Sequence, residues 1–431
     1  MRIWHRFPFP STKLLYALTA VANTYETACI CGCNVQGGFS EELAGGFGVM
    51  DEVLPGENED AFASLEAFTN THRDWLFGHF SYDLKNQIEK GLISNHPDGI
   101  GFPLLYFFRP RIVVRKHDAE TIAIGAATAG EADAFYAQLQ HAAIPPDEIQ
   151  TVPHIQARTS KRDYLQAVNR LKMHIARGDI YETNYCIEYF ADGVRLDAAA
   201  LHLRLCSLSD APFAVYYKHR QKHLCCASPE RFLQKTNRTL RSQPIKGTRR
   251  RGNTPEEDEQ LKHDLQHDAK ERCENVMIVD LVRNDLSRSA QRGSVHVPGL
   301  FEVHTFKTVH QLISTVQAEL RADVHPVEAI KRAFPMGSMT GAPKVRAMQL
   351  CEDAEHMKRG LYSGAVGYFT PETDFDFNVV IRSIQYNEST GHLSLKTGSA
   401  ITAAADAETE FEECSLKAAA MLRALGVKKT V

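Results

Sequence analysis

Three residues near the C-terminal end of the chain have the spacing of one helix face: Glu410, Glu413 and Lys417. Steps of three and four residues place the two carboxylates side by side. Mg²⁺ prefers carboxylate and water oxygens, so the pair could hold this ion, although any solvated helix face can show the same spacing. Glu274 is a comparable group, because it directly precedes the apolar run 276–279 and a half-buried acid needs a partner.

Lys246 stands in the segment Pro-Ile-Lys-Gly-Thr and is followed by arginines at 249–251. A solvated basic loop is the simplest interpretation of such a run. A buried lysine among cations would instead lose its proton and could act as a nucleophile. We expect the arginines to favour this neutral form. Glu230, in a turn that precedes Lys246, could serve as general acid or base if it faces the same pocket.

Three glycine-containing turns could present backbone N–H groups to a carboxylate: 337–341, 363–365 and 398–400. The segment 337–344 does not match the phosphate-binding P-loop pattern. Arg382 lies in the strand-like run 379–384, and an arginine at an inward strand position needs an anion. An outward edge position for Arg382 is equally open.

Local signals define several elements that would position these residues. Ser160 with Asp163 predicts a helix start, and Thr254-Pro255 predicts the start of a long helix that continues to about Leu281. Apolar residues at helical spacing predict a C-terminal helix ended by Gly426. Alternating runs predict strands, which are 104–108, 112–114, 213–217 and 223–227.

The overall composition is that of a globular protein, with 43% hydrophobic and 24% charged residues among 431. A net charge of -4, from 49 basic and 53 acidic residues, argues against nucleic acid or an anionic membrane as a partner. The ten cysteines show no zinc-site spacing and indicate reduced thiols. The run 14–18 is too short for a signal sequence, so we expect a cytoplasmic protein.

Five ordered segments resemble the chorismate-binding enzyme family. The resemblance covers roughly residues 155 to 425, with a weaker match at 75–84. The matching segments are 228–232, 244–248, 274–286, 334–348 and 410–417. Because five segments occur in the family's order, the functional interpretation of Lys246, Glu274, Glu410 and Glu413 replaces that of a solvated surface.

The residue at position 246 separates the chemistries within this family. Members that form anthranilate carry alanine in the Pro-Ile-x-Gly-Thr segment, whereas members that form 4-amino-4-deoxychorismate carry lysine, as this chain does. The resemblance therefore implies amination of chorismate at C4, in para-aminobenzoate and folate biosynthesis, with anthranilate formation as the alternative. Members that add water carry a lysine where this chain has Glu182, so water addition is not expected.

The resemblance also implies a mechanism and a set of site residues. Lys246 would attack C2, Glu230 would protonate the departing C4 hydroxyl, and ammonia would then displace Lys246. Glu274, Glu410 and Glu413 would hold a Mg²⁺ ion that grips the ring carboxylate. The residues implied to bind the two substrate carboxylates are Arg382, Tyr362, Thr340, Gly341, Gly398, Ser399 and Ala400.

No Cys/His glutaminase signature is visible, so we expect a separate glutaminase subunit to supply ammonia, with free ammonia as a fallback. A non-catalytic regulator that binds chorismate or the glutaminase is a third possibility. That possibility predicts loss of Lys246 or of the metal ligands, and both are kept.

The fold implied by the resemblance is α+β, with two large, mostly antiparallel β-sheets packed face to face and helices outside. Periodicity alone supports only mixed α and β. Residues 1–150 would form an N-terminal lobe and residues 155–425 the catalytic region, together one compact unit.

Three positions depart from the family pattern. Gln311 stands where many relatives have a histidine, so that role is either shifted to His310 or lost. Ala400 replaces a usual glycine, and Glu182 replaces a glutamine that is common in the aminating members. The tryptophan-binding leader segment of anthranilate synthases has no match either, so inhibition by tryptophan is not expected.

Overall fold

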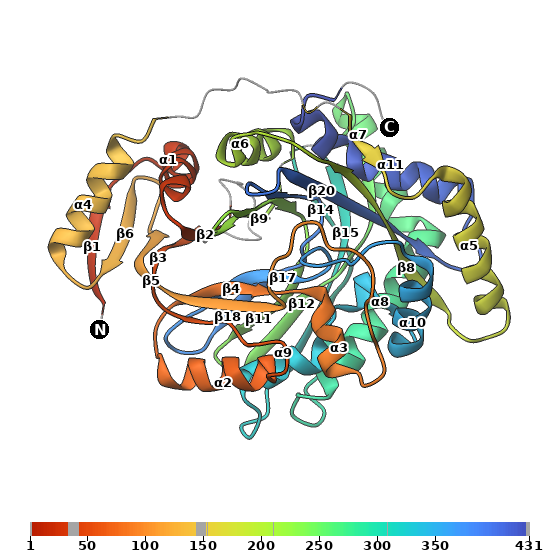
Figure 1. Cartoon of the computed structure of the whole chain (residues 1–431). Coiled ribbons are helices and arrows are strands. Elements are labelled where there is room, and N and C mark those ends of the chain that lie inside the picture. The colour runs from red at the N-terminus through yellow and green to blue at the C-terminus, as the bar shows by residue number, and fades with distance from the viewer. Residues whose placement is uncertain are drawn as a thin grey trace.

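The structure is a computed structural model that describes residues 2–32, 43–143, 152, 154–209, 211–307 and 309–427. Within these ranges, 20 strands are connected into one sheet, and every pairing between them is antiparallel. Helices lie on the outside of this sheet (Figure 1). The predicted α+β class, the antiparallel strands and the outer helices are therefore confirmed.

Strand β5 (Leu105–Lys116) is where the sheet branches. One edge of β5 pairs with β3 (Ala44–Val53), while its other edge pairs first with β4 (Leu76–Phe80) and then with β6 (Thr121–Ala126). Two arms of the sheet leave this strand and fold back over one another (Figure 1). The prediction of two separate sheets is wrong, because β5 is a single long strand that belongs to both layers rather than the two short strands expected.

The first arm continues from β3 through β2 (Thr27–Cys31), β9 (Phe213–His219), β10 (Lys222–Ser228), β19 (Ser383–Asn387), β20 (His392–Ile401) and β8 (Glu182–Ala191). The short strands β7 (Gln156–Ala157) and β16 (Gly341–Ala342) pair with β8, and β1 (Ile3–Pro8) pairs with β6. The second arm continues from β4 through β17 (Ala365–Phe369), β18 (Phe375–Asn378), β11 (Arg231–Thr236), β12 (Thr239–Gln243) and β15 (Val309–Glu319). Strands β13 (Ile245–Arg250) and β14 (His296–Thr305) both pair with β15.

Three apolar clusters fill the layers. One lies between the arms and joins side chains of β2, β9 and β10 to those of β4 and β17. The second packs the first arm against α1 (Ser11–Thr24), α4 (Ala129–Gln140), α5 (Lys161–Ala176), α6 (Ala198–Leu208), α10 (Lys344–Ala354) and α11 (Ala407–Ala424). The third packs the second arm against α2 (Ala61–Thr71), α8 (Ala269–Ser287) and α9 (Pro326–Ala333). The remaining helical elements are η1 (Tyr82–Leu84), α3 (Lys85–Ile88), α7 (Pro255–His267) and η2 (Gly337–Met339).

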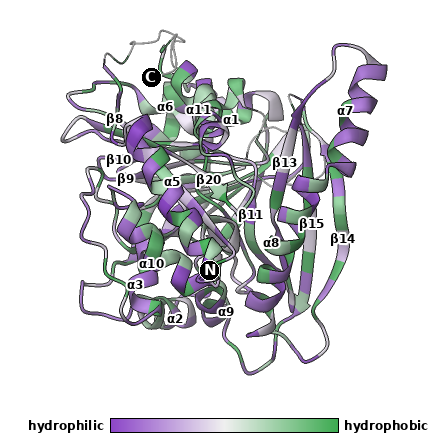
Figure 2. Ribbon diagram, turned by 90° about the vertical axis from the view of Figure 1, so that its right-hand side faces the viewer, coloured by the Kyte–Doolittle hydropathy of each residue, from purple (hydrophilic) through white to green (hydrophobic). Residues whose placement is uncertain are grey.

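Helix starts follow the predicted capping signals. The Ser160 side chain accepts from the Asp163 N–H at the start of α5, and Thr254 does the same for Glu257 at the start of α7. The long helix expected after Thr254 is wrong in length, because Asp268 ends α7 and its carboxylate caps α8. Helix α7 is mostly hydrophilic (Figure 2), which suits a helix at the edge of the molecule.

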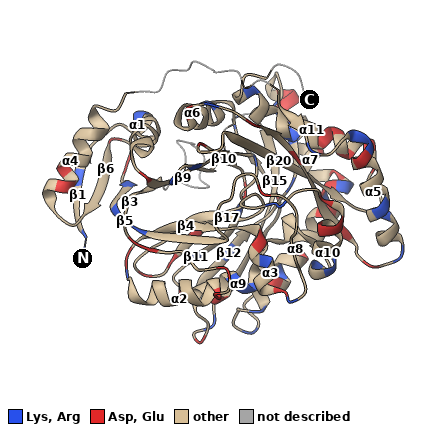
Figure 3. Cartoon of the chain, in the orientation of Figure 1, with Lys and Arg blue, Asp and Glu red and all other residues tan. Residues whose placement is uncertain are grey.

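Acidic and basic residues alternate along the outer helices α5 and α11 (Figure 3), in keeping with the nearly balanced charge of the chain. None of the helices in the described part of the chain combines the length and the apolar character that crossing a bilayer requires.

Candidate active site

Lys246 lies on β13, at an irregularity in its pairing with β15. Its Nζ is 2.9 Å from Glu182 Oε1 and 3.8 Å from Glu274 Oε2. Burial acts to lower the pKa of Lys246, but the nearby carboxylates more than offset this and the net shift is upward. This direction favours the ammonium form of Lys246 and does not agree with the expectation of a neutral side chain.

The three arginines after Lys246 do not act on it as expected, because each has its own acid. Arg249 Nη2 is 2.7 Å from Asp268 Oδ2, and Arg251 Nη2 is 2.6 Å from Asp258 Oδ2. Arg250 pairs with Glu257. These pairs tie β13 and the turn after it to α7 and α8, so the arginine run is structural and leaves Lys246 facing carboxylates.

Glu230 is buried in the turn between β10 and β11. Burial raises its pKa to about 7, against the lowering effects of the Ser338 hydroxyl and of the Lys246 and Lys417 ammonium groups. Its backbone is fixed on both sides, since its N–H donates to Ser228 Oγ at 3.2 Å and its carbonyl accepts from Val379 N–H at 3.0 Å. A carboxyl with this pKa can both donate and accept a proton near neutral pH.

The three predicted metal ligands lie on two facing helices, Glu274 on α8 and Glu410 and Glu413 on α11. Lys270 Nζ is 3.9 Å from Glu274 Oε1 and 3.5 Å from Glu410 Oε1, so one ammonium group joins the helices. Burial raises the pKa of Glu274 and of Glu410, and Glu413 adds to both shifts. The prediction that the three acids lie close together agrees with this electrostatic coupling.

Glu413 differs from the other two acids in the direction of its pKa shift. Burial acts to raise its pKa, but the Lys417 ammonium group, 2.6 Å from Glu413 Oε1, turns the net shift downward. The oxygen donors suit Mg²⁺ chemically. Across the described residues, however, no three His, Cys, Asp or Glu side chains are arranged closely enough to hold a metal ion as they stand. Lysines balance the acids instead.

Arg382 is half-buried, and no acid lies within ion-pair distance of its guanidinium in the part of the chain that the structure describes. Burial lowers its pKa, opposed by Tyr362 and Glu413 nearby. The strand expected at 379–384 is wrong: residues 379–382 form an irregular link between β18 and β19, and Arg382 has a φ of 50°. The inward, anion-seeking interpretation of Arg382 is the one that agrees with these observations.

Residues 398–400 were expected to form a turn, but they belong to β20, opposite Cys186, Tyr185 and Asn184 of β8. The direction in which their N–H groups point follows from the bonds made by β8. The Cys186 N–H donates to Glu355 Oε1 at 3.1 Å and the Asn184 N–H to Thr340 O at 2.8 Å, so neither faces β20.

The residues opposite them, Gly398 and Ala400, are therefore in non-hydrogen-bonded pairs, and their N–H and C=O groups point to the other edge of β20. The Gly398 carbonyl indeed accepts from Lys417 Nζ at 2.8 Å. On that edge, β19 pairs with β20 only up to Leu395, and Arg382 directly precedes β19. The free N–H groups and Arg382 consequently meet at one gap in the sheet, where β19 ends.

Ser399 has a different environment, because it faces the other side of the strand. Its Oγ is 2.7 Å from the Tyr164 hydroxyl of α5, in the core. This bond fixes β20 against α5 and leaves the Ser399 side chain turned away from the gap. Tyr362 is also fully buried, at the turn that precedes β17, beside Arg382.

The expected turn at 337–341 is confirmed, and it is rigid. The Thr340 hydroxyl is 3.2 Å from the Met336 carbonyl and 3.3 Å from the Gly337 carbonyl. Gly341 has a φ of 155°, and a Cβ there would lie 2.2 Å from the Glu182 carbonyl. Only glycine fits this contact, which brings the turn against the first residue of β8.

A buried ion pair holds the same turn from behind. Arg359 Nη2 is 2.6 Å from Glu355 Oε1, and this guanidinium also donates to the carbonyls of Met339 (2.6 Å) and Asn184 (2.7 Å). Both side chains are at most 5% exposed. Sequence reasoning missed this pair. The signal that could have found it is the four-residue spacing of Glu355 and Arg359, next to a segment that matches the family.

Sequence reasoning also noted Glu182 only as a departure from the family, not as a partner of Lys246. Its other carboxylate oxygen, Oε2, is buried and has no hydrogen-bond partner among the described groups. His310 is not a site residue: its ring is 2.9 Å from Asp258 Oδ1 on one side and 2.9 Å from Thr305 Oγ1 on the other. Gln311 occupies the next position on β15.

The geometry now permits comparison with known proteins. The family model described as chorismate binding enzyme matches residues 41–423. This chain belongs to that family. It is 38% identical over 81% of its length to an aminodeoxychorismate synthase of Streptomyces griseus, and 33% identical over 84% to aminodeoxychorismate synthase component 1 of Bacillus subtilis. An anthranilate synthase component 1 of Bacillus caldotenax is 38% identical over 62% of the chain.

The shares of the relatives that are covered differ. The chain spans 80% of the Bacillus subtilis protein, 50% of the Streptomyces griseus protein and 52% of the Bacillus caldotenax protein. It spans half or less of the first curated relatives it matches, 29% to 50% of their length. Among solved structures, anthranilate synthase component I of Streptococcus pneumoniae superposes with a TM-score of 0.78 at 24% identity, over 90% of this chain and 94% of that one. That likeness concerns the fold.

Proposed function

We propose that this chain is the synthase component of an aminodeoxychorismate synthase, which replaces the C4 hydroxyl of chorismate with an amino group. The observation that carries the proposal is Lys246. It occupies the position that distinguishes the chemistries of the family, and it is held by Glu182 beside Glu274 and within the electrostatic influence of Glu230. A basic residue with only a structural role would not need this enclosure by three acids.

The residues present support a balanced two-step reaction. The Lys246 ammonium group passes a proton to Glu182, and the freed amine attacks C2 of chorismate. The ring double bonds shift, the C4–O bond breaks, and the hydroxyl leaves as water with the proton of Glu230. Ammonia then attacks C4 and gives a proton to Glu230, the double bonds shift back, and the C2–N bond breaks to release the Lys246 amine, which regains its proton from Glu182.

Substrate binding would fall to the gap at the end of β19. Arg382 has no ion-pair partner there among the described residues, and the N–H groups of Gly398 and Ala400 point to the adjacent edge of β20. We assign one substrate carboxylate to this group of donors, with Tyr362 beside it. The other carboxylate would lie near the Thr340–Gly341 turn and the acids of α8 and α11.

Mg²⁺ is part of the proposal, with Glu274, Glu410 and Glu413 as its ligands. When bound, the ion would supply positive charge to the ring carboxylate of the substrate. Lys270, which now lies between Glu274 and Glu410, would have to move aside.

A separate glutaminase is the proposed source of ammonia. The name component 1 of the Bacillus subtilis relative supports a second component for that protein. For this chain, addition of ammonium salt bypasses that requirement, and the first experiment can therefore use the chain alone. The cytoplasmic location stays a prediction.

The test is product analysis after the purified chain is mixed with chorismate, Mg²⁺ and ammonium salt. We expect 4-amino-4-deoxychorismate by chromatography and mass spectrometry, and its loss in Lys246→Ala. Unchanged amination by this variant would contradict the role of Lys246. The second candidate, anthranilate synthase component I, is favoured by the 38% identity to the Bacillus caldotenax protein, and it predicts anthranilate and pyruvate in the same assay.

A further inference from the structure

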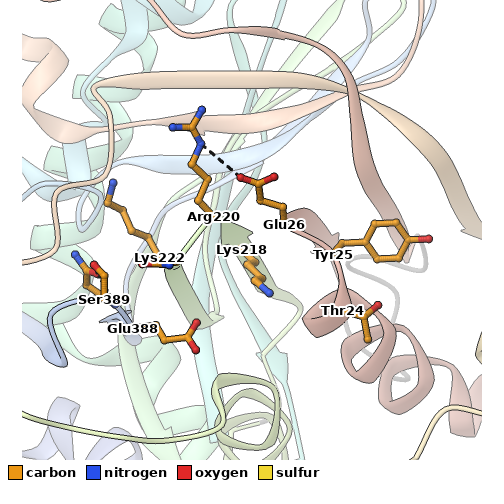
Figure 4. A pocket seen from close by; sticks show the side chains of 10 residues that line it. Thr24, Tyr25, Glu26, Lys218, Arg220, Lys222, Glu388 and Ser389 are labelled. Atoms are coloured by element: carbon orange, nitrogen blue, oxygen red, sulfur yellow. Dashed lines mark hydrogen bonds and ion pairs between the residues drawn. The ribbon is translucent and has the colours of Figure 1, made fainter.

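A polar cavity of about 550 Å³ lies at one end of strands β9, β10, β19 and β20, and Glu230 of the candidate site follows the other end of β10. Three turns form it: the link from α1 to β2, the β9–β10 hairpin and the β19–β20 hairpin. Its lining residues are Thr24, Tyr25, Glu26, Lys218, Arg220, Gln221, Lys222, Asn387, Glu388 and Ser389 (Figure 4). This volume lies within the range of small-molecule sites, about 300–1,000 Å³.

The basic side chains of the cavity are poorly neutralised. Arg220 reaches Glu26 and Glu52 only at 4.0 and 3.9 Å, and no acid lies within ion-pair distance of Lys222 in the described ranges. Burial lowers the pKa of Lys222 and the Arg220 charge lowers it further, while the Asp98 carboxylate opposes both effects. Figure 4 shows that these two side chains extend to the same side of the hairpin. An anion between them would relieve their repulsion.

The opposite part of the cavity has a different character. Lys218 donates to the Asn23 carbonyl at 2.7 Å, and Glu26 and Glu388 both raise its pKa against the larger lowering effect of burial. Glu388 on this side is an acceptor for hydroxyl or ammonium groups. Glu26 lies between the two parts, because it is near both Arg220 and Lys218, so the cavity is polarised from Arg220 and Lys222 at one end to the Glu388 carboxylate at the other.

Backbone bonds hold the three turns together. The Glu388 N–H donates to the Gln221 carbonyl and the Arg220 N–H to the Glu26 carbonyl, both at 2.8 Å. The Asn387 side chain accepts from the Ser389 hydroxyl at 2.6 Å and donates to the Ile100 carbonyl at 3.0 Å. A ligand would thus meet a formed site and would not have to order the loops first.

We propose that this cavity binds a small metabolite that carries an oxyanion, a phosphate or a carboxylate, at one end and hydrogen-bond donors at the other. The oxyanion lies between Arg220 and Lys222, and the donors face Glu388. The site is separate from the reaction: β10 runs from Lys222 to the turn that holds Glu230, a strand length of about 20 Å at about 3.3 Å per residue.

The probes are inorganic phosphate and, separately, succinate, titrated at constant ionic strength while the unfolding temperature of the whole chain is measured. We expect a saturating rise with at least one of them. The double variant Arg220→Gln with Lys222→Gln should weaken that binding about tenfold or more, since two charge-assisted hydrogen bonds are lost. A response to phosphate alone identifies a phosphate ligand, and a response to succinate alone identifies a carboxylate ligand.

The matched control is Lys262→Gln with Arg283→Gln, which removes the same charge from exposed positions on α7 and α8. It should bind the probes as the unmodified chain does. Two results would overturn the proposal: no saturable rise with either probe, or equal binding by both double variants, which would mean a general charge effect. Binding that persists fully without Arg220 and Lys222 would place the anion elsewhere, for example at Arg382.

Discussion

The buried pair Glu355–Arg359 allows the sharpest test of how the site is held. Replacement of Arg359 by methionine leaves the Glu355 carboxylate buried without its counter-charge, which costs about 3–5 kcal/mol of unfolding free energy. It also leaves the Met339 carbonyl without its donor, whereas the Asn184 carbonyl keeps the Cys351 thiol at 3.3 Å. Each orphaned buried group adds about 1–3 kcal/mol. Arg359→Met should therefore be severely destabilised.

Removal of both charges separates the two contributions. In Glu355→Met with Arg359→Met no buried charge remains, but the N–H of Cys186 and the carbonyl of Met339 stay unpaired, while the Asn184 carbonyl keeps the Cys351 thiol. We expect a loss of about 2 kcal/mol or more from these two groups. The double variant should still be more stable than Arg359→Met alone, because an apolar pair is better tolerated than a lone buried charge.

The matched control is the pair Glu188–Lys396, in which Glu188 lies on β8 and Lys396 on the neighbouring strand β20. Its side chains are 3.3 Å apart and at most 4% exposed, but Glu188 bonds only to other side chains, those of Ser394 and Arg158. Its double methionine variant leaves the Ser394 hydroxyl and the Arg158 guanidinium without their carboxylate but orphans no backbone group, so its loss should be smaller than that of the Glu355–Arg359 double variant. Urea unfolding followed by circular dichroism measures all variants. Equal losses for the two double variants would refute the argument.

Three further predictions concern the site itself. Glu230 has a pKa of about 7 and must be protonated to release the hydroxyl, so the rate of amination should fall as the pH rises through about 7. In Glu230→Gln most of the activity should be lost, and the remaining rate should no longer fall in this pH range. Gly341→Ala should cost about 2 kcal/mol or more in thermal unfolding because of its backbone strain and contact, whereas Gly130→Ala, at an open helix position, should be neutral or stabilising. Glu413→Gln should raise the Mg²⁺ concentration needed for half-maximal rate. The control Glu412→Gln, at the exposed neighbouring position, should leave that concentration unchanged. The same Mg²⁺ dependence in both variants would show that Glu413 is not a ligand.

Sequence reasoning succeeded where the signal is local. The caps at Ser160 and Thr254 depend on a side chain and an N–H three residues on, and both are confirmed. Gly426, which follows the last turn of α11 with a φ of 77°, is a local signal of the same kind. The close grouping of the acids on α8 and α11 required more, since periodicity gave the spacing on each helix and only the family resemblance connected them.

Long-range pairing explains what could not be predicted. Residues 398–400 have the composition of a turn, but β8 supplies a partner strand and makes them extended. The run 379–382 has the composition of a strand, but its neighbours place Arg382 at a left-handed backbone conformation beside the gap. The charge of Lys246 likewise depends on Glu182, which is distant in sequence, and not on the adjacent arginines.

The charges of the site balance before substrate arrives. Among the described residues, four cations face four ionisable carboxylates, with Glu230 left aside because its pKa is about 7. The cations are Lys246, Lys270, Lys417 and Arg382, and the carboxylates are Glu182, Glu274, Glu410 and Glu413. A substrate with two carboxylates would add two negative charges to this group, and Mg²⁺ would add two positive ones.

Either charge alone would disturb the balance in a buried site, whereas both together preserve it. We therefore expect Mg²⁺ and chorismate to strengthen each other's binding, by the same factor in both directions. Calorimetric titration of chorismate with and without Mg²⁺, and of Mg²⁺ with and without chorismate, measures that factor when ammonia is omitted. Binding constants that are independent of the other partner would show that charge balance does not govern this site, and that Lys270 and Lys417 do not stand in for the metal.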